Sequence, residues 1–489
     1  METKNTAVFT DDNAVIQGTM EWFERVSAIP HGSWNEKAVV DMLEERFAQI
    51  GWKTVRDAWN NLMAYIPATA GLENRKPVVL QGHIDMVCAV ADGSGYVPER
   101  DPINLVIEGN ILKTDHRSSL GGDCVLADCL AIWLLQQKIP HGPVRLLLTT
   151  VEEQGLFGAR QVAAEWLAGV DNLINIDGSS LGNMTIGCAG GWREHITRKM
   201  EYTAPTMKEA YKLSMDGFVG GHSGGHIHLG RGNPIRLITH FLGSLRGKLP
   251  FELAALKGGS AYNALPQDAS AVIVTDDGAA LTQAVEEFRT AVKKYYKIFD
   301  PDIAINLAPV PVPQQVWTAT LKEAALDLAA LLHHGVYARM DTDPTKVASS
   351  GNLGMWKLND KDEMVITTFI RCKSTFDESQ MGARHAVAAR LCGFAVDVDS
   401  HPGWDGSPDT PLVKLICDVY NRQTGKEMAV SGTHAGLEPA VLGEKNPNME
   451  MVSFGPTLRN LHSITEWADL SSLPGFAQLL SGVLAELAK

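Results

Sequence analysis

The chain has 489 residues, of which 45% are hydrophobic and 20% are charged. This composition is typical of a globular protein and excludes an intrinsically disordered chain. Because a single hydrophobic core stops growing at about 250–300 residues, the length predicts at least two domains. The formal net charge of -14 argues against a phosphate-backbone partner, so we expect no binding to nucleic acid.

The cysteines and the apolar segments indicate a cytoplasmic protein. The seven cysteines are odd in number and scattered, and no Cys-x-x-Cys pair occurs, which favours a reducing compartment over a disulfide framework. Residues 1–12 are acidic and lack the apolar segment of a signal peptide. No unbroken apolar run reaches the ~18 residues of a membrane span, so we expect no membrane partner.

Helices and strands are expected to alternate in the first part of the chain. Apolar residues recur at helical spacing over 14–28, 35–49 and 125–136. Short apolar runs that stop at glycine or at an acidic residue predict strands at 77–81, 143–151 and 172–176. Because strands that alternate with helices are typical of a mainly parallel sheet flanked by helices, the expected fold class is α/β.

From about residue 191 the pattern changes to α+β. The expected elements there are strands at 271–275 and 364–370 and amphipathic helices at 279–296 and 317–334. After about residue 398 the α/β pattern returns, with helices near 411–423 and 473–488. The predicted architecture is one domain made of residues 1–190 and 398–489, interrupted by an inserted α+β domain of residues 191–397.

Polar side chains follow three of the expected strands at the point where each strand ends. His83 and Asp85 follow the first strand, Glu152 and Glu153 the second, and Asp177 the third. Each group taken singly is explained by an ordinary polar strand end or a solvated acidic loop. Carboxyl ends of parallel strands are where α/β proteins bind ligands, so three such ends together favour one site. Imidazole and carboxylate ligands without thiolate suit a catalytic pair of zinc, manganese or cobalt ions.

The spacing within two of these groups suggests how they would work. His83 and Asp85 are two residues apart, so on an extended segment they face the same side, where Asp85 can hold the second ring N–H of a metal-bound His83. Glu152 and Glu153 are adjacent and can reach one site only if the strand has just ended, which Gly155 permits. One glutamate could then bind metal while its neighbour takes a proton from water.

Three further segments are less specific. Asp123 lies directly before an expected helix, where a helix cap is the simpler interpretation, but a glycine-rich turn could also present it to two cations. His462 could close the site if the C-terminal segment returns to the first domain; a surface histidine is the simpler interpretation. The glycine- and histidine-rich stretch 220–228 could be a third metal site or a substrate-contacting loop, and His226 and His228 receive no role.

Taken together and in order, the motifs resemble the aminoacyl-histidine dipeptidases (peptidase D, Xaa-His dipeptidase, carnosinase-like), within the two-zinc metallopeptidases that include peptidase T and aminoacylase. The resemblance runs from about residue 14 to the C-terminus. The matching segments are 78–87, 152–153, 155–159, 176–177, 186–191, 220–225, 263–266, 433–438 and 453–462. The resemblance implies a catalytic metallopeptidase domain and an inserted lid or dimerisation domain.

The resemblance also implies the metal ligands. His83 and Asp177 would hold one ion, Glu153 and His462 would hold the other, and Asp123 would bridge them. The implied cofactors are two divalent ions, Zn²⁺ in the first place, with Co²⁺ or Mn²⁺ as alternatives.

The remaining roles come from the same resemblance. Asp85 would orient His83, Glu152 would be the general base, and His222 would steady the tetrahedral oxyanion, commonly from a partner subunit. Three further positions resemble substrate-binding residues: Asn263, Arg371 and His434.

The chain departs from the family at a few positions. The family usually has Gly-Ala-Asp-Asn-Gly where residues 121–125 read Gly-Gly-Asp-Cys-Val, so Asp123 is kept while Cys124 and Val125 change the turn. His226 stands where an acidic residue is common, and Gln267 where a basic residue is frequent. We expect these changes to affect the choice of substrate more than the chemistry.

The predicted reaction is hydrolysis of an Xaa-His or β-alanyl dipeptide such as carnosine by a metal-bridged hydroxide, with Glu152 as general base. One alternative is an N-acyl amino acid deacylase or a broader aminopeptidase on the same scaffold. Another is a metal-stabilised binding protein without turnover, but binding alone has no use for Glu152. The expected partners are a small dipeptide substrate and a second copy of the chain in a homodimer.

Overall fold

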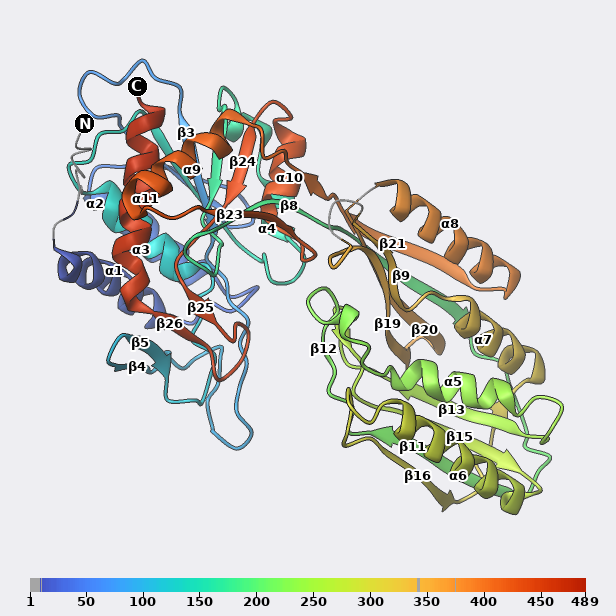
Figure 1. Ribbon diagram of the computed structural model, residues 1–489. Coiled ribbons are helices and arrows are strands. Elements are labelled where there is room, and N and C mark those ends of the chain that lie inside the picture. The colour runs from blue at the N-terminus through green and yellow to red at the C-terminus, as the bar shows by residue number, and fades with distance from the viewer. Residues whose placement is uncertain (1–8, 10, 341–343, 374) are drawn as a thin grey trace. The chain divides into compact units, whose positions relative to one another are not determined.

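The computed structural model describes residues 9, 11–340, 344–373 and 375–489 (Figure 1). Contacts within the chain divide it into two compact units. Unit 1 runs to Cys188 and resumes at Trp404, and unit 2 is the segment Ala189–Gly403 between them.

Unit 1 is built on a nine-stranded mixed sheet in the order β1-β2-β6-β3-β7-β24-β8-β22, with β23 paired to β8. Its strands are β1 (Lys53–Arg56), β2 (Leu62–Ile66), β3 (Val78–His83), β6 (Val144–Thr149), β7 (Asn172–Asn175), β8 (Asn183–Cys188), β22 (Trp404–Asp405), β23 (Ala429–Thr433) and β24 (Glu450–Ser453). Strands β6, β3, β7 and β24 run parallel to one another. Their carboxyl ends therefore lie along one edge of the sheet.

Helices cover both faces of this sheet. They are α1 (Asp12–Ser27), α2 (Lys37–Gln49), α3 (Val125–Leu135), α4 (Phe157–Gln161), α9 (Pro411–Thr424), α10 (Glu438–Lys445) and α11 (Leu473–Leu487), with 3₁₀ turns η1 (Ala164–Leu167) and η3 (Leu470–Ser472). Alternate strand residues enter different cores: Leu80 packs with α1, α3 and α11, whereas Val79 packs with α4 and α10. Central strands buried on both faces are the rule for a parallel sheet, and the predicted α/β class is confirmed.

A small four-stranded sheet ties the C-terminal segment to the first part of the chain. Its order is β25-β26-β5-β4. The strands are β4 (Leu105–Glu108), β5 (Ile111–Thr114), β25 (Leu458–Arg459) and β26 (Trp467–Asp469). Because β26 pairs with β5, the connection between β25 and β26, which contains His462, is anchored to residues far earlier in sequence.

Helix α11 lies in the core of unit 1. The window Leu470–Leu487 has a mean hydropathy of 1.2 and is long and apolar enough to cross a membrane by those two criteria. Polar residues interrupt this window, so no unbroken apolar run marks it in the sequence. Its apolar residues, such as Phe476 and Leu480, are completely buried against α1, α3 and α9, which is the packing of a core helix.

Unit 2 is an α+β unit. Its antiparallel sheet has the order β16-β11-β15-β13-β19-β20-β9-β21, with β18 paired to β19. The strands are β9 (Gly190–Lys199), β11 (Glu209–Asp216), β13 (Glu252–Gly258), β15 (Ala269–Thr275), β16 (Ala304–Val310), β18 (Gly335–Arg339), β19 (Val347–Leu358), β20 (Glu363–Cys372) and β21 (Ala395–His401). Two short pairs accompany it: β10 (Tyr202–Thr203) with β17 (Val316–Trp317), and β12 (Gly221–His222) with β14 (Ala264–Leu265).

Four helices pack on one face of the sheet of unit 2 (Figure 1). They are α5 (Pro234–Ser244), α6 (Gly278–Tyr295), α7 (Ala319–Leu331) and α8 (Thr375–Leu391), and a 3₁₀ turn, η2 (Ile227–Leu229), precedes α5. Ile238, Leu281 and Leu321 of the first three helices enter one core with Leu213 and Ile273 of the sheet. The amphipathic spacing that predicts helices at 279–296 and 317–334 corresponds to α6 and α7, and their apolar faces share this one buried interface.

Candidate metal centre

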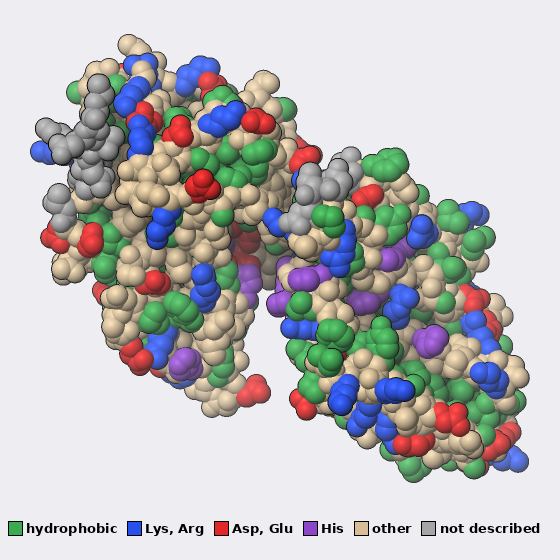
Figure 2. Space-filling model, in the orientation of Figure 1, with side chains coloured by type: hydrophobic (Ala, Val, Ile, Leu, Met, Phe, Trp, Pro, Cys, Tyr) green, Lys and Arg blue, Asp and Glu red, His purple; other side chains and the backbone are tan. Residues whose placement is uncertain are grey.

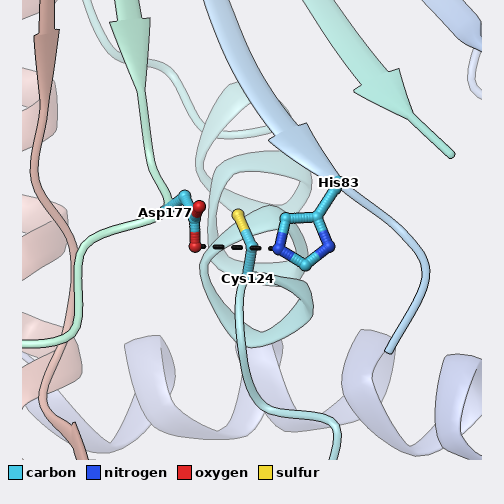
Figure 3. Close-up of side chains that lie close together, drawn as sticks. All are labelled: His83, Cys124 and Asp177. Carbon is cyan, nitrogen blue, oxygen red and sulfur yellow. Dashed lines mark ion pairs between the residues drawn. The ribbon is translucent and has the colours of Figure 1, made fainter. Parts of the chain in front are cut away.

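The polar strand ends of unit 1 meet at one edge of the sheet. His83 is the last residue of β3, Asp177 lies just beyond β7, and Glu152 and Glu153 lie just beyond β6. His83 Nε2 is 3.7 Å from Asp177 Oδ1 (Figure 3). A ring nitrogen of His83 and carboxylate oxygens of Glu152 and Glu153 also lie within 4.8 Å of one another. Parallel register therefore brings the three groups together.

The C-terminal segment supplies a second imidazole at the same edge. His462 Nε2 lies 2.8 Å from Glu153 Oε1 and 3.1 Å from Asp123 Oδ2. His462 has a φ of 62°, in the left-handed region that non-glycine residues rarely adopt. The anchoring of β25 and β26 holds this unfavourable backbone, and such strain is concentrated at functional sites.

The donor groups fit divalent cations. Among the described residues, three overlapping sets each bring their ligand atoms within 4.8 Å of one another: His83, Cys124 and Asp177; His83, Glu152 and Glu153; Asp123, Glu153 and His462. Among the described residues, the ion pairs of these carboxylates come from the two histidines and none from Lys or Arg. So much buried negative charge is costly without positive charge beside it, and nitrogen and oxygen donors suit zinc-like ions.

The electrostatics of the cluster follow from burial and from this crowding of carboxylates. Burial raises the pKa of Glu152 well above its usual range, and burial also raises the pKa of Asp123 and Glu153. For His462, partial desolvation of the ring lowers the pKa, but the hydrogen bonds that the ring donates to Asp123 and Glu153 outweigh this effect and raise the pKa to about 11. Each group thus holds a proton more tightly than it would in water.

Asp85 joins the end of β3 to the turn after β6. Its carboxylate accepts the backbone N–H groups of Glu152 (2.9 Å) and Glu153 (3.3 Å) and the hydroxyl of Ser33 (2.8 Å). His83 Nδ1 lies 3.0 Å from the backbone oxygen of Asp85 and 3.6 Å from its carboxylate. Asp85 therefore fixes both the histidine ring and the backbone of the two glutamates.

The turn after β6 explains how two adjacent glutamates serve one site. The strand ends at Thr149, and Val151 has a φ of 52°, which is strained for a β-branched residue. The N–H of Val151 donates to the carboxylate of the buried Glu36 at 3.1 Å, and the N–H of Thr150 donates to Asn61 Oδ1 at 3.1 Å. These bonds hold the turn that follows β6. Because the strand has ended there, Glu152 and Glu153 need not point to opposite faces as adjacent strand residues do.

Two buried glutamates without a predicted role support the ligands. Glu466 accepts hydrogen bonds from the backbone N–H groups of residues 120–123, at 2.9–3.4 Å, and so shapes the glycine turn that presents Asp123. Glu438, the first residue of α10, accepts from the hydroxyl of Thr149 at 2.7 Å and from the side-chain amide of Gln81. In the sequence, a Glu in a polar loop and a Glu at a helix start have ordinary explanations, so neither signals this role.

A second polar cluster lies within unit 2. His222 Nε2 is 3.1 Å from a guanidinium nitrogen of Arg371, and Arg371 Nε is 3.4 Å from the hydroxyl of Ser223. The N–H of Ser223 donates to the backbone oxygen of Asn263 at 2.8 Å, and the N–H of His222 donates to His226 Nδ1 at 3.0 Å. His226 therefore holds the loop. The face of unit 2 in Figure 2 carries several histidine side chains.

The remaining predicted position, His434, belongs to unit 1. It directly follows β23, which pairs with β8 in parallel. The structure therefore gathers the five expected ligands, Asp85 and Glu152 within unit 1, and it gathers His222, Arg371 and Asn263 within unit 2.

The structure shows an α/β unit with a candidate cation site at one edge of its sheet, and comparison with known proteins identifies the class of protein. Residues 79–486 match the model of the peptidase family M20/M25/M40. The chain belongs to this family and is a peptidase.

Known relatives narrow the class further. Over 474 residues the chain is 31% identical to the cytosol non-specific dipeptidase of Escherichia coli K12, covering 95% of this chain and 96% of that protein. The crystal structure of aminoacylhistidine dipeptidase from Vibrio alginolyticus matches with a TM-score of 0.78 and 29% identity over 96% of both chains. Aminopeptidase PepT from Bacillus cereus, with a TM-score of 0.55 and 13% identity over 97% of this chain and 99% of that one, shares the fold. The family resemblance and the enzyme class predicted from the sequence are confirmed.

Proposed function

We propose that the protein is a dinuclear metallo-dipeptidase that hydrolyses Xaa-His or β-alanyl dipeptides such as carnosine. The observation that carries the proposal is the convergence of Glu152 with two imidazoles and three further carboxylates at one sheet edge. The names of two relatives support it, because one is a non-specific dipeptidase and the other an aminoacylhistidine dipeptidase. The alternatives of a deacylase and of a binding protein have no such support.

The residues that would hold the two ions follow from the distances. His83 and Asp177 would hold one ion, Glu153 and His462 the other, and Asp123, beside His462, would be shared. When bound, such ions polarise the peptide carbonyl and make water acidic enough to attack near neutral pH.

Glu152 would move the proton in this reaction. Glu152 faces the same site as His83 and Glu153 but, unlike Glu153, makes no close ion pair with His462. We therefore assign Glu152 as the proton acceptor rather than as a metal ligand. Because burial raises its pKa, its carboxylate accepts a proton from the attacking water readily and can then deliver it to the leaving amine. The carbonyl–nitrogen bond breaks as that proton arrives.

The cluster of unit 2 would bind the substrate's oxygen atoms. His222 would donate to the oxygen that gains negative charge, and the Arg371 guanidinium would pair with the terminal carboxylate of the dipeptide. Asn263 and His434 are proposed as further substrate contacts.

We propose that the protein is a cytoplasmic homodimer in which His222 acts from the partner subunit, and that Zn²⁺ is the physiological ion. The word cytosol in the name of the Escherichia coli relative supports the location.

Replacement of Glu152 by Gln tests the assigned base. Dipeptide turnover is expected to fall by at least about 10²–10⁴-fold, because proton transfer is lost, while two equivalents of metal stay bound. The matched control is Glu165→Gln, an exposed glutamate in η1, which should keep full activity. Loss of metal together with activity in the Glu152→Gln protein would show that Glu152 is a ligand instead.

A substrate panel tests the proposed class. The zinc-loaded protein would be incubated with carnosine, an α-aminoacyl-histidine, a dipeptide without histidine and an N-acetyl amino acid. Cleavage of the histidine dipeptides with no release from the N-acetyl compound is the expected outcome. Faster turnover of the N-acetyl amino acid would contradict the proposal and favour the deacylase.

A further inference from the structure

Cys124 lies at the candidate metal centre. It follows Asp123 and is the N-cap residue of α3. Its sulfur, a ring nitrogen of His83 and a carboxylate oxygen of Asp177 all lie within 4.8 Å of one another. Figure 3 shows the sulfur between His83 and Asp177, next to the dashed line that joins them, with the helix behind it. An imidazole, a carboxylate and a thiol from three separate segments of the chain thus surround one point.

A buried carboxylate beside this cysteine independently indicates a cation. Asp128 lies one helical turn after Cys124 in α3, is completely buried, and has no hydrogen-bond partner for either carboxylate oxygen among the described residues. A side chain at Gly82 would meet Asp128 Oδ1 at 2.1 Å and the sulfur of Cys124 at 2.7 Å. Both groups therefore press against the backbone just before His83. An isolated buried carboxylate is unfavourable unless positive charge lies near it.

We propose that Cys124 is a sulfur ligand of the ion held by His83 and Asp177. The inference rests on the proposed metal centre and assigns to it a ligand beyond the five nitrogen and oxygen donors. Binding breaks the S–H bond and forms a sulfur–metal bond, and the thiol proton is released. Asp128 lies against the same glycine, Gly82, as the sulfur, so the positive charge of the ion would offset its negative charge.

The sulfur makes the two ion positions chemically unequal. The position of His83 and Asp177 gains a soft donor, whereas that of Glu153 and His462 offers nitrogen and oxygen alone. Thiolate favours zinc and related ions over manganese and magnesium, which prefer oxygen. The chain should therefore retain one zinc-like ion strongly even when manganese is in excess, and exchange the other more readily.

Cobalt substitution tests the sulfur ligand directly, because a thiolate bound to Co²⁺ gives an intense near-ultraviolet charge-transfer band that imidazole and carboxylate ligands do not. The full-length protein would be loaded with Co²⁺, and metal content, the band and dipeptide turnover would be measured on the same sample. We expect the band in the wild type and its loss in Cys124→Ser and Cys124→Asn. The matched control is Cys129→Ser, a buried cysteine of the same helix, which should keep the band.

The outcomes separate this inference from the proposed function. Two bound Co²⁺ ions and dipeptide turnover without the band in the wild type would overturn the sulfur ligand and leave the dipeptidase intact. A band that persists in both Cys124 variants would overturn it as well. Failure of the wild type to bind metal or to cleave dipeptides would overturn the proposed function itself. If one Cys124 variant does not fold, the band of the wild type and its loss or persistence in the second variant still show whether the sulfur binds the ion.

Discussion

At the scale of residues, the candidate centre depends on side chains behind the ligands as much as on the ligands. Glu466 holds the turn of Asp123, Asp85 holds the turn of Glu152 and Glu153, and Glu438 holds the end of β6 beside β3. These outer contacts are hydrogen bonds to backbone or neutral groups, and they fix the directions in which the ligands point.

Glu438 gives the folded protein a specific pH dependence. Burial raises its pKa from 4.5 to about 8, so the folded state favours the protonated acid. The stability that this group contributes is fully present below its unfolded pKa near 4.5 and is lost as pH rises through about 8. Glu438→Gln keeps an oxygen acceptor for Thr149 and has no charge to bury. The metal-free variant should therefore gain stability over wild type as the pH rises, by a few kcal/mol at most.

Thermal or denaturant unfolding of the two metal-free proteins at about pH 5 and about pH 9 measures this gain. Glu444→Gln is the matched control, since Glu444 lies in the same helix but is exposed. A difference between wild type and Glu438→Gln that does not change with pH would contradict the assignment.

The sequence shows the strand-end residues and the supporting Asp85 in recognisable form, but not the supports Glu466 and Glu438. His83, Asp177 and the two glutamates stand at ends of apolar runs, and the parallel register that unites them follows from the α/β pattern. Glu466 reaches residues 120–123, more than three hundred positions earlier in the chain, and no local pattern encodes such a contact. Asp128 is similarly hidden, because a single Asp in an apolar helix does not reveal what it faces.

At the scale of elements, the site depends on the close approach of two loops. A side-chain carbon on Gly455 would lie 2.1 Å from the backbone oxygen of Gly178, and one on Gly178 would lie 2.3 Å from the backbone nitrogen of Gly455. The first loop follows Asp177 after β7, and the second follows β24 and leads to His462. Neither contact atom belongs to a movable side chain, so the two glycines set how near the two ligands can come.

Gly455→Ala should push these loops apart. We expect a loss of about 1–3 kcal/mol of folding free energy from the clash and weaker metal binding, because Asp177 and His462 move relative to each other. Chemical unfolding and metal titration measure the two effects. Gly243→Ala in α5, where a side chain meets nothing within 4 Å, is the control and should be neutral or stabilising. Unchanged metal affinity in Gly455→Ala would contradict this account.

Elements with an apolar run or a helical period could be predicted, and strands of two or three residues could not. The expected strand 77–81 corresponds to β3, and the expected helix 125–136 to α3. The expected strand 143–151 is β6, which ends earlier, at Thr149, because Val151 turns into the left-handed region. The pair of β25 and β26 has too few residues for a period, and its partner β5 is remote in sequence.

At the scale of the whole molecule, the chain divides at Cys188/Ala189 and at Gly403/Trp404. The domain limits expected from the sequence are 190/191 and 397/398. The change from alternating βα units to antiparallel strands marks such a division in the sequence. The assignment of unit 1 as catalytic and unit 2 as lid and dimerisation domain remains a proposal.

His222→Ala tests whether unit 2 takes part in the chemistry of unit 1. Because His222 is the proposed oxyanion donor, kcat should fall by about 10²–10³-fold while the metal content stays the same as in the wild type. His228→Ala, in the 3₁₀ turn of the same segment, is the matched control and should leave kcat unchanged. Steady-state kinetics on carnosine and metal analysis give both quantities, and an unchanged kcat in His222→Ala would confine the chemistry to unit 1.

We propose that side chains from distant parts of the chain hold two cations at the carboxyl edge of one sheet. Anomalous diffraction at the zinc absorption edge, from crystals of the zinc-loaded protein, locates such ions. We expect two peaks about 3.5–4 Å apart, one beside His83 and Asp177 and the other beside Glu153 and His462. A single peak, or peaks remote from Asp123, would contradict it.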